Sequence, residues 1–130
     1  MKKDIQMAQN FDALTAEIGL VVSSILQTDL ALLRGYSQAK ARAIASFTLI
    51  LGEGYATGAI TDEQLNTEMV ELERMVTRFV RNIQALATTT IERLLRGVGA
   101  LLITTITRLA GLPALNLGAA SGTIWGVGPA

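Results

Sequence analysis

Few side chains in this sequence are of the types that carry out chemistry. The chain contains neither histidine nor cysteine, which removes the commonest general base, the thiol nucleophile and the soft metal ligands. Its serines lie in helical or small-residue contexts without a base to activate them; they are Ser23, Ser24, Ser37, Ser46 and Ser121. The sequence therefore predicts no nucleophilic catalytic site.

Two local patterns invite comparison with binding sites. Glu68 and Glu71 lie three residues apart and would share one face of a helix, but the di-metal pattern of helical bundles needs a Glu-x-x-His pair. The segment "GEGYATG" has closely spaced glycines and lacks the Lys-Ser/Thr pair of a phosphate-binding loop. A solvated carboxylate pair and a helix-terminating turn are the favoured interpretations. We predict a non-enzyme with no metal, cofactor or small-molecule substrate.

Composition points to a partner for apolar surface. At 130 residues the chain has the length of one domain. Half of its residues are hydrophobic, and 17% are charged against about 25% in a typical soluble protein. The formal net charge is zero, so no basic excess suggests a stable complex with nucleic acid. The excess apolar surface is expected to meet other protein chains or lipid.

Residues 1–60 are predicted to form a hairpin of two helices. Apolar residues recur at three-four spacing over residues 4–34, and Gly35 is a suitable helix stop. A second helix is expected from the N-cap Ser37 to about Gly52. Its many alanines allow close approach of a neighbouring helix.

One long helix is predicted over residues 61–110. Thr61 and Gln64 form a capping box, and no proline or glycine follows before Gly97. At about 1.5 Å per residue this helix would approach 70 Å and project beyond a compact bundle. Its apolar stripe shifts phase near residues 87–91, so its two halves are expected to bury against different partners.

The C-terminal region is the least charged part of the chain. From Gly97 to the last residue only Arg108 is charged. Gly111 and Pro113 are expected to end the helix, leaving residues 111–130 as an uncharged extended arm that contains both prolines. The predicted fold class is thus all-α, with two shorter helices, one long C-terminal helix and this arm in a single structural domain. The side chains predicted to face another subunit or a membrane are Leu94, Val98, Leu101, Leu102, Ile103, Ile106, Leu109, Leu112, Leu115 and Trp125.

Charge is segregated along residues 61–110, with acidic residues first and arginines after them. Complementarity to the helix dipole and ordinary solvated faces explain this pattern. The alternative is head-to-tail pairing between the acidic end of one subunit and the basic middle of another. The arginines predicted to line a lumen or an interface between subunits are Arg74, Arg78, Arg81, Arg93, Arg96 and Arg108.

In layout, the chain resembles the small internal, or ejection, proteins of short-tailed bacteriophages. The features that carry this resemblance are the initial Met1, the long helix over 61–110 and the apolar glycine-rich end; no specific motif is involved. The resemblance implies a virion component, forming an ejection channel or associated with the tail or portal. It also implies rings or tubes of helical subunits, with Arg93, Arg96 and Arg108 facing passing DNA.

Three functional hypotheses follow. The leading one is a structural protein that assembles with copies of itself and with other structural proteins, and contacts or crosses a membrane. The others are a holin-like or toxin-like membrane permeabiliser and a soluble helical adaptor. Lys2 and Lys3 are followed by polar residues rather than by an apolar run, so we expect no secretory signal and synthesis in the cytoplasm. The final location, virion or host envelope, stays open.

Overall fold

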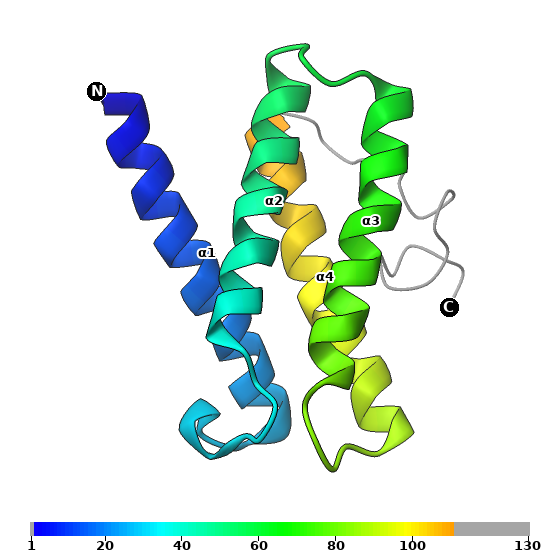
Figure 1. Cartoon of the computed structure of the whole chain (residues 1–130). Coiled ribbons are helices and arrows are strands. Elements are labelled where there is room, and N and C mark those ends of the chain that lie inside the picture. The colour runs from blue at the N-terminus through cyan, green and yellow to red at the C-terminus, as the bar shows by residue number, and fades with distance from the viewer. Residues whose placement is uncertain (1, 111–130) are drawn as a thin grey trace.

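The protein is an antiparallel bundle of four α-helices within its described residues. The computed structural model describes the backbone of residues 2–110 and the side chains of residues 10–110. The helices are α1 (Lys2–Leu26), α2 (Gln38–Ala56), α3 (Asp62–Arg81) and α4 (Thr88–Ala110), and a short 3₁₀ helix, η1 (Leu30–Leu32), follows α1. Successive helices run in opposite directions (Figure 1). The predicted all-α class is confirmed, and the predicted arm over 111–130 lies outside the described residues.

Helices α2 and α4 form the centre of the bundle. They contact each other and both remaining helices, whereas α1 and α3 lie on opposite sides of this pair without mutual contact over residues 2–110. Ala41 and Ala45 on α2 are fully buried. Gly52, also on α2, has no room for a side chain, since a Cβ there would lie 2.7 Å from Leu109 Cδ1. Small side chains on α2 therefore permit the close approach that its sequence indicates.

Residues 61–110 form two helices, and the prediction of one long helix is wrong. Helix α3 ends at Arg81, and α4 begins at Thr88 and returns along the bundle (Figure 1). Between them Ala85 adopts a left-handed φ of 64°, which a continuous right-handed helix cannot contain. The phase shift of the apolar stripe near residues 87–91 marks this reversal.

Burial of the apolar face of α4 favours the reversal. A projecting helix would leave that face in water, and each large aliphatic side chain that is buried instead contributes about 1.5–3 kcal/mol. Four such side chains of α4 are completely buried in the bundle: Leu94, Val98, Leu102 and Ile106. The Gln84 N–H also donates to the Arg34 carbonyl at 2.9 Å, so the connection 82–87 is held by the connection 27–37.

The predicted helix over 4–34 is too long. Helix α1 ends at Leu26 because Gln27 has a left-handed φ of 51°. Asp29 then caps η1, its carboxylate accepting a hydrogen bond from the Ala31 N–H at 3.2 Å. The apolar spacing continues past residue 26 because leucines of this connection also pack against the core.

The other predicted helix starts are confirmed. The Ser37 hydroxyl accepts a hydrogen bond from the Lys40 N–H at 3.1 Å at the start of α2. At the start of α3, the Gln64 N–H donates to Thr61 Oγ1 at 3.1 Å, and the Thr61 N–H donates to Gln64 Oε1 at 2.9 Å. This reciprocal pair is the predicted capping box. Helix α2 continues to Ala56, four residues beyond its predicted end.

A tyrosine ties α2 to α3 across the connection 57–61. The Tyr55 hydroxyl donates a hydrogen bond to the Asp62 carboxylate. This hydrogen bond, followed by desolvation and the charge of the carboxylate, raises the pKa of Tyr55 above its ordinary value. A side-chain hydrogen bond therefore joins α2 to α3 at the end of the bundle opposite to connections 27–37 and 82–87 (Figure 1).

Replacing Tyr36 with phenylalanine is expected to leave the free energy of unfolding unchanged or to raise it by up to about 1 kcal/mol. The Tyr36 hydroxyl is buried without a hydrogen-bond partner among the described residues, so its removal relieves desolvation and breaks no bond. The ring keeps its edge-to-face contact with Phe79, at 5.4 Å between centroids. Urea denaturation measures the change. Tyr55→Phe is the control and should lower stability, since it loses the hydrogen bond to Asp62. A larger loss of stability in Tyr36→Phe than in Tyr55→Phe would show that the Tyr36 hydroxyl does have a partner.

Candidate functional site

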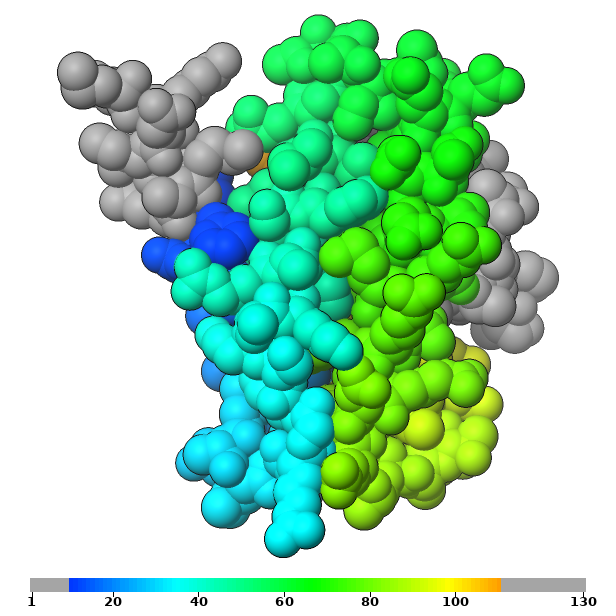
Figure 2. All heavy atoms as spheres, viewed as in Figure 1, coloured from blue at the N-terminus to red at the C-terminus, as the bar shows by residue number. Residues whose placement is uncertain are grey.

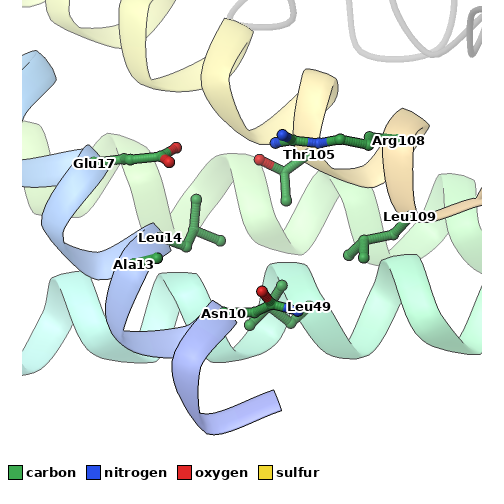
Figure 3. Close-up of a pocket in the computed structure, with 8 residues that line it drawn as sticks. All are labelled: Asn10, Ala13, Leu14, Glu17, Leu49, Thr105, Arg108 and Leu109. Atoms are coloured by element: carbon green, nitrogen blue, oxygen red, sulfur yellow. The ribbon is translucent and has the colours of Figure 1, made fainter. Parts of the chain in front are cut away.

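A cleft of about 300 Å³ opens between α1 and α4, above one residue of α2. Its volume lies at the lower end of the range of about 300–1,000 Å³ seen for ligand pockets. The buried side chains of Leu14 and Leu49 lie at its base, and half-buried Leu109 lies on one wall. Among the described residues, the lining is Asn10, Ala13, Leu14, Glu17, Leu49, Thr105, Arg108 and Leu109 (Figure 3).

Helical spacing brings polar residues to the edges of the cleft. Asn10, Ala13 and Glu17 recur at intervals of three and four along α1, and Thr105 and Arg108 lie three apart on α4. Leu14 and Leu109, which are interspersed with them, face inward to the same cleft. The result is an apolar base with a polar rim contributed by two antiparallel helices.

Opposite charges face each other across this rim. In Figure 3 the Glu17 carboxylate and the Arg108 guanidinium extend toward one another from α1 and α4. Both residues are exposed, and neither has an ion-pair partner within 4.0 Å among the described residues. The Thr105 hydroxyl, on the same side as Arg108, donates to the Leu101 carbonyl at 2.8 Å, so it presents acceptor lone pairs to the cleft.

A second, smaller hollow lies between α2 and α3, which pack against each other along the face seen in Figure 2. Its volume is about 200 Å³, with Ile44 and Met75 in the groove and Lys40 and Arg78 at its edges. Two cations beside an apolar slot would favour an anionic partner.

The predicted apolar contact residues divide into three groups. Leu94, Val98, Leu102 and Ile106 lie in the core of their own bundle, so the prediction that they face another subunit or a membrane is wrong for these four. The half-buried residues Leu101, Ile103 and Leu109 are partly accessible at the bundle surface. The predicted residues Leu112, Leu115 and Trp125 lie outside the described residues.

No helix within residues 2–110 combines the length and the hydropathy that a transmembrane span requires. Glu68 and Glu71 are not joined by a third acidic residue placed to share a metal ion, and no such group of three occurs elsewhere in the described chain.

The six predicted arginines are all exposed, but they do not form one group. Arg74 forms an ion pair with Glu71, at 3.5 Å between Nη1 and Oε2. Arg108 lies on the cleft, near the end of α4. The remaining four gather toward the bundle end where α3 ends and α4 begins: Arg78, Arg81, Arg93 and Arg96.

Folding turns charge segregation along the chain into segregation between the two ends of the bundle. We call the region near connections 27–37 and 82–87 the basic end, and the region near connection 57–61 the acidic end (Figure 1). The cations of the basic end are Arg34, Lys40, Arg78, Arg81, Arg93 and Arg96. The carboxylates of the acidic end are Asp12, Glu53, Asp62, Glu63 and Glu68. Arg42 also lies near the basic end. Asp29 and Glu92 at the basic end, and Arg108 at the acidic end, have the opposite sign, and residues of both signs lie nearer the middle of the helices: Glu17, Glu71, Glu73 and Arg74.

The cations of the basic end have no ion-pair partners within the described part of the chain. The structure therefore leaves a positive surface and a negative surface on one molecule, with their charges available to a partner. The sequence pattern indicated the segregation along residues 61–110. It did not show that Arg34, Lys40 and Glu53, from the first hairpin, add to the same two surfaces.

Sequence reasoning also missed Asn10 and Glu17 as site residues. The helical recurrence of polar residues beside Leu14 was a signal, but an exposed polar stripe is the common property of amphipathic helices. Only the approach of α4 places Arg108 opposite that stripe. No known protein family, curated protein or solved structure matches this chain in sequence or in fold.

Proposed function

We propose that this chain is a non-enzymatic structural protein that assembles head to tail with copies of itself through its oppositely charged ends. The observation that carries the proposal is the segregation of exposed and half-buried charged side chains between the basic and acidic ends. Eleven basic and eleven acidic residues give the whole chain zero net charge, so no overall repulsion between copies opposes contact of a basic end with an acidic end. Repeated head-to-tail contact generates a ring or an open filament.

Electrostatics favours this arrangement over isolated molecules. Like charges gathered at one end repel one another, and pairing them with the opposite end of a second copy relieves both repulsions. Exposed pairs contribute little one by one, roughly 0–1 kcal/mol each. Several pairs acting together with apolar contacts would be needed to hold an assembly, and the half-buried apolar residues at the bundle surface are available for such contacts.

The resemblance to ejection proteins adds little support. It depends mainly on one long projecting helix, and residues 61–110 form a folded hairpin instead. A role in a virion, or in carrying DNA past Arg93 and Arg96, therefore stays a hypothesis with no observation in its favour beyond exposed arginines. Assembly with copies of itself does not depend on that resemblance.

Reversing the charges of either end is expected to abolish assembly, and mixing the two variants is expected to restore it. One variant carries Lys40→Glu, Arg93→Glu and Arg96→Glu, and the other carries Asp12→Lys, Glu53→Lys and Glu68→Lys, so that three reversals change the sign of one end. Each alone has two ends of like charge. The mixture again offers opposite surfaces. Light scattering after size exclusion at about 0.02 M and about 1 M salt measures the mass, and wild-type assemblies should dissociate at the higher salt because surface charges are screened.

The substitutions are chosen to spare the fold. Lys40 lies in the first turn of α2, where glutamate complements the helix dipole, and Arg93 is exposed in the second turn of α4. Glu53 lies in the last turn of α2, where the positive charge of a lysine complements the helix dipole. Helicity and the denaturation midpoint serve as controls. A wild-type monomer at low salt, or assembly of either variant alone at the wild-type mass, would refute the proposal.

A further inference from the structure

We infer that the cleft between α1 and α4 binds a small zwitterion with an apolar group, of the class of aliphatic α-amino acids. The inference goes beyond assembly, since it concerns the cleft of Figure 3 rather than the charged ends. It begins from two charges of opposite sign at the rim of a hollow with an apolar base.

The rim can satisfy both charges of such a ligand. The Arg108 guanidinium offers a planar set of donors that matches a carboxylate. The Glu17 carboxylate accepts hydrogen bonds from an ammonium group, and the Thr105 hydroxyl, whose proton is used by the Leu101 carbonyl, also acts as an acceptor. The Asn10 side chain adds one further polar group at the rim.

The base of the cleft selects for an aliphatic group. Leu14 and Leu49 are only 3% and 4% exposed, so they close the base of the cleft but offer little accessible area. Most of the apolar contact falls to half-buried Leu109 and exposed Ala13. An aliphatic side chain placed against them and against Leu109 would be removed from water, which contributes about 25 cal/mol per Å² of apolar surface. The volume of about 300 Å³ admits a single molecule of this size.

Other ligand classes fit the cleft less well. A simple anion would pair with Arg108 but would meet the repulsion of Glu17, and a simple cation would have the reverse problem. A neutral apolar molecule would cover both charges without pairing either, at a cost in desolvation. Only a ligand with both charges satisfies both sides of the rim.

Chemical-shift titration of the full chain with L-leucine tests the inference. We expect saturable shifts confined to the residues that line the cleft. Arg108→Gln and Glu17→Gln should each weaken the affinity at least tenfold, because each removes one charge–charge contact. Arg74→Gln is the control: Arg74 is an exposed arginine outside the cleft and outside the cations of the basic end, and its replacement should leave the affinity unchanged.

Two analogues separate the contributions of the charges. Isocaproate lacks the ammonium group and leucinol lacks the carboxylate, and each should bind at least tenfold more weakly than leucine. Absence of saturable shifts, equal binding of either analogue, or unchanged affinity in both cleft variants would overturn the inference. It would also be overturned if Glu17 and Arg108 showed only coupled effects on thermal stability, the result expected for a direct ion pair between α1 and α4. Because binding is read at the cleft residues, this outcome is independent of whether the chain assembles.

Discussion

Replacing Gly35 with alanine is expected to lower the free energy of unfolding by about 3 kcal/mol or more. Gly35 has a φ of +88°, and a Cβ at this position would lie 1.8 Å from the Asn82 carbonyl oxygen. That oxygen belongs to the backbone and cannot rotate away, so the connections 27–37 and 82–87 would have to separate. The hydrogen bond from the Gln84 N–H to the Arg34 carbonyl would then be lost as well. Urea denaturation followed by circular dichroism measures the change.

Gly58 provides the matched control for this substitution. It also has a left-handed φ, +80°, but nothing lies within 4 Å of the position a Cβ would take. Gly58→Ala therefore adds only the backbone strain, about 1–2 kcal/mol. The difference between the two variants measures the contact between the two connections. Equal losses would show that this contact does not hold the basic end together.

Replacing Leu102 with alanine is expected to lower the free energy of unfolding by about 3 kcal/mol, within the range of 2–5 kcal/mol for buried leucines. Leu102 is completely buried at the centre of α4, so truncation removes apolar contact and leaves a cavity. The effect should not vary with protein concentration, because the cavity lies inside one chain. An interface leucine would instead make the denaturation midpoint depend on concentration. Denaturation at several protein concentrations therefore separates a core residue from an interface residue.

The neighbouring Leu101 is the control. It has the same chemistry and the same helix but is only half-buried, so Leu101→Ala should cost less than half as much. A larger loss at Leu101 than at Leu102 would mean that α4 presents the other face to the core. The comparison therefore tests whether the face of α4 that is buried in the bundle core is the one formed by Leu94, Val98, Leu102 and Ile106.

Only those parts of the fold that depend on close neighbours in the chain could be predicted. The Ser37 cap and the Thr61–Gln64 capping box join atoms three residues apart, so their sequence patterns suffice. The all-α class follows equally from three-four apolar spacing. The end of α1 was missed because Gln27 is neither glycine nor proline, and its left-handed backbone has no sequence signal.

The reversal after Arg81 shows what local patterns omit. Residues 82–87 contain no glycine or proline, and nearly every residue there is compatible with a helix. Ala85 takes a left-handed conformation, and its cost is offset by the burial of the apolar face of α4 against α1, α2 and α3. The preference for this turn depends on helices far along the chain. The phase shift of the apolar stripe near residues 87–91 indicated that α4 has different packing partners from α3, but did not identify them.

By itself, the sequence determined the helical class, two of the helix starts and the absence of histidine and cysteine chemistry. Those properties depend on residue type and on spacings of three or four. Tertiary structure decided that α4 returns to its own bundle, that Glu17 faces Arg108 across a cleft, and that basic and acidic residues occupy opposite ends. The physical reason is that each of these features joins segments far apart in sequence, whose approach is set by the burial of apolar surface within the whole bundle.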